Sequence, residues 1–304
     1  MSRIRVVGYM GLNFISSVGI IWTNKLAYNR GFTFAITLTI LHFLLTFAGL
    51  RMTCRPKKLA LTAVVPISIA FCGFVVFNNL SLQFNPVGTY QLLKVMTTPT
   101  IVLLQYVFYN ARLPLIQLMS LVPVCLGVAL ATVASLETNL RGLGFGIAGI
   151  ISTSIYQIWV KTEQTRLDCT AEELLYYQAP VSAVLLAFLL PVLEDTKNLV
   201  SFNWLSGECV LWVLISSILA FLVNLSIFLV IGKTSPLSYN VLGHAKLCVI
   251  LVSGYVWFDE SCSMKNLAGI VLAVGGIIWY TSLKLAAPLE PFNRKETAQE
   301  EGTE

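Results

Sequence analysis

The sequence has little charge, two histidines and no paired cysteines. Charged residues make up 12% of its 304 residues and hydrophobic residues 56%, with a mean hydropathy of +0.77. A soluble protein carries about 25% charged residues. This composition therefore excludes a soluble protein and predicts a polytopic membrane protein. The histidines lie far apart and none of the seven cysteines forms a Cys-x-x-Cys pair, so we expect no metal site and no cofactor. The net charge of +5 gives no indication of nucleic-acid binding, because the basic residues lie in loops beside apolar segments. We expect membrane lipid as a partner and no nucleic acid.

Carboxylates are missing from the apolar segments. All fifteen acidic residues fall in loops, at segment ends or in the C-terminal tail. Carriers driven by protons or sodium usually place an Asp or Glu within the membrane, so we expect no co-transported cation. A membrane-bound transferase or hydrolase would need a carboxylate or histidine cluster near one interface. Neither Glu172-Glu173 nor Asp259-Glu260 has such partners, and we do not expect an enzyme.

Long apolar runs fill most of the chain. Each is bounded by charge, proline or glycine, and they fall at 6–28, 34–52, 60–83, 87–109, 113–135, 143–161, 174–193, 209–231, 237–258 and 266–285. This pattern predicts an all-α membrane protein with ten transmembrane helices. The first run follows Arg3 and Arg5 but lacks a small-residue cleavage site, so we interpret it as a retained span.

The basic residues of the loops are unevenly distributed between the two sides. The side of the N-terminus has thirteen: Arg3, Arg5, Arg51, Arg55, Lys57, Lys58, Arg112, Lys161, Arg166, Lys233, Lys284, Arg294 and Lys295. The other side has four: Arg30, Arg141, Lys197 and Lys265. The positive-inside rule therefore predicts that both termini are cytoplasmic.

The two halves of the chain resemble each other. Phe77-Asn-Asn-Leu-Ser-Leu82 matches Val223-Asn-Leu-Ser-Ile227, and each is followed by a proline, a tyrosine and a buried lysine; Ile21-Trp22 likewise matches Ile158-Trp159. We predict a first repeat at 1–140, a second at 141–287 and a disordered cytoplasmic tail at 288–304. Because five helices per half is odd, the repeats must be inverted in the membrane, which is typical of transporters with a midplane site.

Lys94 and Lys246 lie deep within apolar runs. They follow Pro86 and Pro236 by eight and ten residues, which at about 1.5 Å per residue is roughly 12–15 Å, near the middle of a hydrocarbon core about 30 Å thick. No carboxylate is there to pair with them, so we expect the substrate to supply the negative charge, and lysines suit phosphate oxygens. Two unpaired ammonium groups would also make an empty return costly and predict obligatory exchange. The alternative is that each lysine binds backbone carbonyls and only shapes the fold.

Polar and aromatic residues accompany the two lysines. Tyr90, Tyr239 and Asn240 precede them by one or two turns, Thr97 and Thr98 share a face with Lys94, and Asn79 and Asn224 are amides within apolar helices. Aromatic rings could stack on a base or sugar and amides could read a base or ribose; the alternatives are packing and interhelical hydrogen bonds. Gly243 allows close approach of a ligand or a helix, and Lys25 either lines the cavity or reaches the headgroups. His42 has no evident partner and is interpreted as structural, and His244 points away from Lys246 on a helix.

Two stretches resemble a known family. Gly88–Pro99 and Thr234–Lys246 resemble the paired lysine segments of the triose-phosphate translocator and nucleotide-sugar transporter families, within the drug/metabolite transporter superfamily. The resemblance covers about residues 6–285. It is closest to the solute-carrier-35 E branch and the plant Golgi UDP-sugar transporters, through Leu175–Pro180 and Phe71–Leu82. It implies two inverted five-helix repeats and exchange of a cytosolic nucleotide sugar for a lumenal nucleoside monophosphate, in the Golgi membrane or, as second choice, the endoplasmic reticulum.

Departures from the family patterns narrow the substrate. Plastid phosphate translocators carry an arginine after the second lysine, where this chain has Leu247. GDP-mannose transporters carry Phe-Tyr-Asn-Asn and Gly-Ala-Leu-Asn-Lys, which Phe221–Asn224 and Gly243–Lys246 match only in part. A UDP-sugar is therefore the preferred expectation. A sugar-phosphate translocator is the alternative, a non-transporting membrane regulator the lesser one, and a homodimer stays open.

Overall fold

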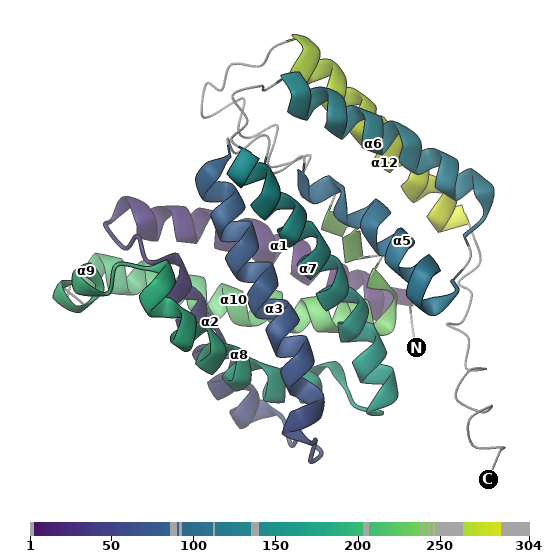
Figure 1. Cartoon of the computed structure of the whole chain (residues 1–304). Coiled ribbons are helices and arrows are strands. Elements are labelled where there is room, and N and C mark those ends of the chain that lie inside the picture. The colour runs from purple at the N-terminus through teal and green to yellow at the C-terminus, as the bar shows by residue number, and fades with distance from the viewer. Residues whose placement is uncertain are drawn as a thin grey trace.

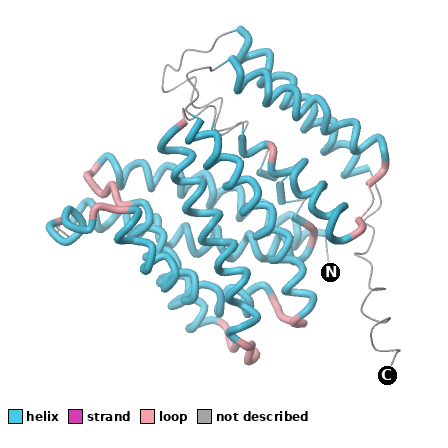
Figure 2. Tube along the Cα trace, viewed as in Figure 1, coloured by secondary structure: helices cyan, strands magenta, loops and turns pink. Residues whose placement is uncertain are grey.

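The computed structural model describes residues 3–85, 90, 93–111, 113–134, 140–202, 207–236, 239–240, 242–243, 246 and 264–286, and every element in this part is a helix (Figure 2). The helices are α1 (Arg3–Asn29), α2 (Ala35–Thr53), α3 (Leu61–Phe84), α5 (Thr97–Tyr109), α6 (Leu115–Ala134), α7 (Leu140–Arg166), α8 (Ala171–Leu193), α9 (Thr196–Ser201), α10 (Gly207–Lys233) and α12 (Met264–Ala286).

Six of these helices are long and apolar enough to cross a membrane: α1, α2, α3, α7, α8 and α10. Shorter apolar stretches lie in α6 (Leu115–Leu130) and α12 (Leu267–Leu283). Many large apolar side chains of the helices point outward. On α8, for example, Phe188 is 78% exposed and Val192 is 82% exposed. Outward apolar side chains suit lipid rather than water, and this confirms the expected membrane protein.

The expected spans overlap described helices, except that 237–258 lies almost wholly outside the described residues, as does the tail 288–304. Two differences stand out. The short helix α9, at the left edge of Figure 1, was not predicted, and Asp195 caps its N-terminus by accepting from the backbone N–H groups of Lys197 and Asn198.

The second difference is that the expected span 87–109 is not one continuous helix. Helical residues 93–95 are followed by a turn at Met96, and α5 begins at Thr97. Pro99 explains the break, because its ring would collide with the carbonyl of residue 95 in a continuous helix. The Met96 N–H instead donates to the Leu93 carbonyl, three residues back, at 3.0 Å. Lys94 thus lies on a short helical piece separate from α5.

Helix α8 begins three residues earlier than expected, at Ala171. Thr170 and Glu173 form a capping box, in which the Thr170 hydroxyl accepts from the Glu173 N–H and the Glu173 carboxylate accepts from the Thr170 N–H. Helix α8 therefore extends beyond the apolar residues that defined its expected span. Helix α7 also does so, since it runs from Leu140 to Arg166 where 143–161 was expected.

Helices α2 and α8 are fastened to each other at both ends. Beyond the end of α8, the Glu194 carboxylate accepts from the backbone N–H groups of Ile36 and Thr37 and from the Thr37 hydroxyl, which caps the N-terminus of α2. At the opposite end, Glu173 accepts from the backbone N–H of Lys57, just after α2, at 3.0 Å. A carboxylate suits a helix N-terminus, where unpaired N–H groups carry partial positive charge.

The helices pack in a few extensive pairs: α3 with α7, α1 with α10, α2 with α8, and α6 with α12. The α6–α12 pair lies side by side at the upper right of Figure 1. Its backbones approach so closely that a Cβ atom on Gly127 would lie 2.6 Å from the Gly269 carbonyl oxygen. On the other helix, a Cβ on Gly276 would lie 2.8 Å from the Val124 nitrogen, so glycine is needed at both positions.

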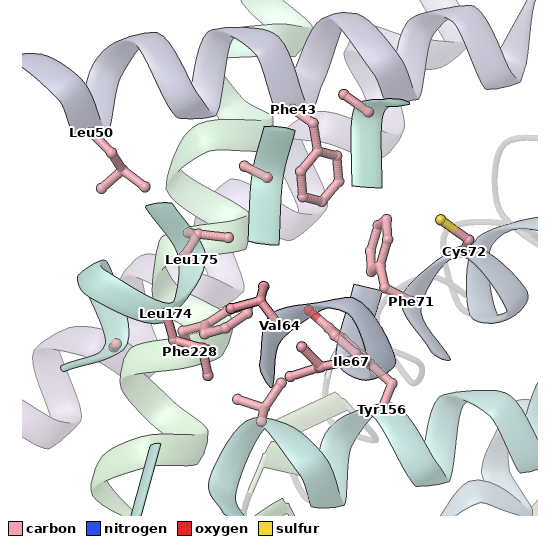
Figure 3. Packing of buried hydrophobic residues seen from close by; sticks show 14 of the residues in the cluster. Phe43, Leu50, Val64, Ile67, Phe71, Cys72, Tyr156, Leu174, Leu175 and Phe228 are labelled. Carbon is pink, nitrogen blue, oxygen red and sulfur yellow. The ribbon is translucent and has the colours of Figure 1, made fainter. Parts of the chain in front are cut away.

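An aromatic core joins α2, α3, α7, α8 and α10 (Figure 3). The Phe43 and Phe71 rings lie 4.6 Å apart between centroids, and Phe71 lies 5.3 Å from Tyr156. Tyr239 packs against this core from outside it. The core thereby supports one of the tyrosines that the sequence placed next to a lysine.

Candidate functional site

Lys246 is buried, with 8% of its surface exposed, and neutral side chains hold its ammonium group. Its Nζ donates to Asn13 Oδ1 at 2.7 Å and to Ser17 Oγ at 3.2 Å, both on α1. It also lies 5.2 Å from the centroid of the Tyr239 ring, within cation–π range. These partners are side chains and not the backbone carbonyls of the alternative interpretation, and none of them carries the compensating negative charge.

Asn13 is the residue at this site that sequence reasoning missed. It is fully buried, and while its Oδ1 faces Lys246, its Nδ2 donates to Ser226 Oγ on α10 at 2.9 Å. The sequence carries one signal that could have found it, an amide in the middle of the apolar run 6–28. Its pairing with Lys246 spans 233 residues, which no local pattern predicts.

Lys94 is placed differently. Its side chain is exposed, and its Nζ lies 4.5 Å from the centroid of the Tyr90 ring, whose own side chain is buried. Within the described part of the chain, the structure gives Lys94 no hydrogen bond to another side chain. Among the described residues, its contact is therefore with the face of the Tyr90 ring.

The two lysines have similar settings, because each ammonium lies over the ring of a tyrosine. Like charges repel, and an anion bound by both lysines would relieve that repulsion. The expected pair of lysine and tyrosine is thus present twice, with Tyr90 at Lys94 and Tyr239 at Lys246.

The remaining expected site residues have mixed settings. Asn240 is buried, and its Nδ2 has no hydrogen-bond partner among the described residues. Thr97 and Thr98 are buried at the start of α5, and the Thr97 carbonyl accepts from Ser154 Oγ at 3.5 Å. A Cβ added to Gly243 would meet no described atom within 4 Å, so nothing seen in the structure requires glycine there for packing.

Two of the expected amides differ in what they do. Asn224 Nδ2 donates to Thr46 Oγ1 at 3.4 Å, from α10 to α2, which is the interhelical bond of the alternative interpretation. Asn79 is half-buried, whereas its neighbour Asn78 is buried and bonds Thr153 on α7. The Lys25 side chain and all of His244 lie outside the described residues.

His42 has a partner, which corrects the expectation that it has none. Its Nε2 lies 2.8 Å from Ser216 Oγ on α10, and that hydroxyl donates to Asn24 Oδ1 on α1. Because Ser216 gives its own hydrogen to Asn24, His42 Nε2 must be the donor to Ser216. The network links three helices, α1, α2 and α10, and is compatible with the predicted structural role of His42.

Comparison with known proteins places the chain. The family model of the Triose-phosphate Transporter family matches residues 4–281. The chain is 36% identical over 290 residues to UDP-xylose transporter 2 of Arabidopsis thaliana, covering 92% of this chain and 81% of the relative. It is 33% identical over 291 residues to UDP-rhamnose/UDP-galactose transporter 2 of the same plant, covering 92% and 83%.

The fold also has a counterpart among solved structures. One protein crystal structure matches with a TM-score of 0.60 at 16% identity, covering 94% of this chain and 100% of the other. A likeness at that identity shows the fold alone. The family match over nearly the whole chain and the identities above 30% show that this chain belongs to the Triose-phosphate Transporter family.

Proposed function

We propose that this protein is a nucleotide-sugar transporter that takes a UDP-sugar from the cytosol and exchanges it for a lumenal nucleoside monophosphate. The observation that carries the proposal is the pair of lysines, Lys94 and Lys246, whose contacts within the described part of the chain are all with neutral side chains. Relatives named as UDP-xylose and UDP-rhamnose/UDP-galactose transporters support the substrate class.

The residues around the lysines have roles in this proposal. Lys94 and Lys246 bind the phosphate oxygens, and Tyr90 and Tyr239 present ring surface beside them. Asn240 Nδ2, which has no partner within the described part of the chain, donates to the ligand in this proposal. Thr97, Thr98, Asn79, Gly243 and Lys25 complete the lining, whereas Asn224 contributes by holding α10 against α2.

The proposed architecture is ten helices in two inverted repeats, 1–140 and 141–287. Counting five helices per half, α1 corresponds to α7, α2 to α8, α3 to α10 and α6 to α12. If each helix is replaced by its counterpart in the other half, the α3–α7 contact becomes the α10–α1 contact, and the α2–α10 contact becomes the α8–α3 contact. The α2–α8 and α6–α12 contacts are unchanged by this replacement. All six contacts are present, which supports a two-fold relation between the halves.

The same charges support exchange by alternating access. A loaded site is near neutral, whereas an empty occluded site would hold two ammonium groups. At roughly 2.5–3.5 kcal/mol per buried charge, the empty return would be slowed by about two orders of magnitude per lysine. The apolar segments of the sequence contain no carboxylate that could couple transport to protons.

The helix break at Met96, beside Lys94, also supports alternating access. In many transporters, discontinuous helices form the substrate site.

A sugar-phosphate translocator is the second candidate, because the matched family is named for triose phosphate. Leu247 disfavours a sugar-phosphate translocator, since the plastid members have an arginine at that position. We propose residence in the Golgi membrane, consistent with nucleotide-sugar transport.

The test is exchange by purified protein in liposomes. Vesicles are preloaded with UMP, GMP or inorganic phosphate, or left empty, and uptake of UDP-xylose, UDP-galactose, GDP-mannose and triose phosphate is measured. We expect UDP-sugar uptake only into UMP-loaded vesicles, unchanged by a pH gradient. Phosphate-dependent uptake of triose phosphate would favour the second candidate, and equal uptake into empty and loaded vesicles would exclude exchange.

A further inference from the structure

A chain of hydrogen bonds ends at the Lys246 ammonium. Ser226 Oγ donates to the Val223 carbonyl at 2.9 Å and accepts from Asn13 Nδ2 at 2.9 Å. Asn13 Oδ1 in turn accepts from Lys246 Nζ at 2.7 Å. Since Asn13 and Ser226 are both fully buried, no solvent competes for these bonds. Ser226 therefore decides which way the Asn13 amide faces, and the amide presents its oxygen to the lysine.

Within the described part of the chain, Lys94 has no such support. Counted from the matching Ile-Trp pairs, Asn13 and Ser17 correspond to Ile150 and Ser154 on α7. Ile150 has no hydrogen-bonding side chain, and Ser154 bonds the carbonyls of Ile150 and Thr97 instead of a lysine. The two lysines are thus held unequally, and the difference lies in one amide on α1.

We propose that Asn13, oriented by Ser226, is a positioning residue that holds Lys246 as the fixed phosphate-binding group of the site, while Lys94 closes on the ligand from the other half. The inference rests on the proposed function, since it assigns Lys246 a phosphate to bind. It adds three residues of α1 and α10 to the site: Asn13, Ser17 and Ser226.

The role explains why an amide rather than a carboxylate stands at position 13. An amide oxygen orients an ammonium without neutralising it, so the full positive charge remains for the ligand. Aspartate has the same shape, and Ser226 Oγ can turn its hydrogen from the Val223 carbonyl to the carboxylate, but the aspartate charge would pair with Lys246 and compete with phosphate. A purely structural residue would tolerate Asn13→Asp in function as well as in folding.

The experiment compares Asn13→Asp, Asn13→Ala and Ser226→Ala with Ser81→Ala. Ser81 is the repeat counterpart of Ser226 and is bonded by Asn85, not by a group that contacts a lysine. We expect Asn13→Asp to fold but to raise KM for UDP-sugar exchange about tenfold or more, the size of a lost hydrogen bond to a charged group. Ser226→Ala should raise KM less, and Ser81→Ala should leave it unchanged.

A second readout does not depend on transport. Amine-reactive labelling of Lys246, followed by mass spectrometry, should be faster in Asn13→Ala than in the wild type, because an ammonium that no longer donates to Asn13 Oδ1 more easily loses a proton and reacts as the neutral amine. A folded Asn13→Asp protein with wild-type KM, or an unchanged labelling rate in Asn13→Ala, would overturn the positioning role. If the wild type exchanges no nucleotide sugar, the proposed function fails, and the labelling rate still decides whether Asn13 holds Lys246.

Discussion

Lys94 and Lys246 would meet the same anion under different constraints. Lys246 is enclosed and bonded to Asn13 and Ser17, whereas Lys94 is exposed and rests on the Tyr90 ring. Replacing either with alanine should abolish exchange while the protein still folds, since removing an unpaired charge from the membrane does not weaken folding. Exchange in liposomes and size-exclusion profiles of the purified variants measure both outcomes.

Arginine should separate the two lysines. Lys94→Arg keeps the charge where there is room for a larger group, so we expect it to retain part of the exchange rate. Lys246→Arg must fit a planar guanidinium between Asn13 and Ser17, and we expect it to lose exchange as alanine does. The alanine variants could instead unfold for the most part, while the fraction that stays folded transports normally. That result would assign the lysines a structural role.

Cys169, in the turn between α7 and α8, gives a pH-dependent prediction. Burial, together with the negative charge of Glu173, raises the pKa of its thiol to about 11. Because the thiolate is the reactive form, alkylation at pH 7 should be far slower than that of a free peptide cysteine. The rate should rise as the pH approaches 11 and thiolate forms.

A variant that keeps only Cys169 allows this rate to be followed with N-ethylmaleimide between pH 7 and 10. Glu173→Gln removes one of the charges that raise the pKa, so it should speed alkylation at a given pH. A wild-type thiol that reacts at the free-peptide rate at pH 7 would contradict the raised pKa.

At the scale of helices, the α6–α12 contact depends on Gly127. A methyl group there would lie 2.6 Å from the Gly269 oxygen and 2.8 Å from the Ala273 Cα, and neither backbone can move aside alone. We expect Gly127→Ala to destabilise the protein by about 1–3 kcal/mol, the usual cost of overpacking. The measurement is thermal unfolding of the purified protein in detergent.

Gly144→Ala is the matched control. Gly144 also lies in a helix, α7, but a Cβ there has no atom within 4 Å. The substitution should be neutral or stabilise by up to about 1 kcal/mol, because alanine favours a helix over glycine. If both variants melt alike, the close α6–α12 contact does not limit stability.

Most helices could be predicted because membrane spans leave a strong local signal, a long apolar run between charges. The missed features depend on single residues. Pro99 breaks a helix within an apolar run, Asp195 starts α9 in a polar one, and the Thr170–Glu173 capping box starts α8 before its apolar residues begin. Each has a sequence signature that hydropathy alone does not weigh.

The site was predictable in part. The two lysines and their tyrosines were expected because lysines within apolar runs and repeat matches are visible in the sequence. Asn13 and the Ser216 partner of His42 were not, because each contact joins segments more than 170 residues apart and relies on how helices pack. Nothing in a single sequence tells which buried amide will face which lysine.

For the whole molecule, the distribution of basic loops predicts that both termini are cytoplasmic. Tags on each terminus should both be digested by protease added outside sealed Golgi vesicles, with a lumenal protein as the protected control. Protection of one tag alone would require an odd number of spans and would exclude the inverted repeats.

The fastening of α2 to α8 has a mechanical consequence. Glu194 joins the C-terminal end of α8 to the N-terminus of α2, and Glu173 joins the N-terminal end of α8 to the segment after α2. Because both ends are bonded, the two helices resist sliding along each other. They also form a pair that the proposed two-fold relation maps onto itself. In the proposed alternating access, we therefore expect this pair to move little, and the motion that opens one side of the membrane and closes the other to fall to the surrounding helices, including those that hold the lysines.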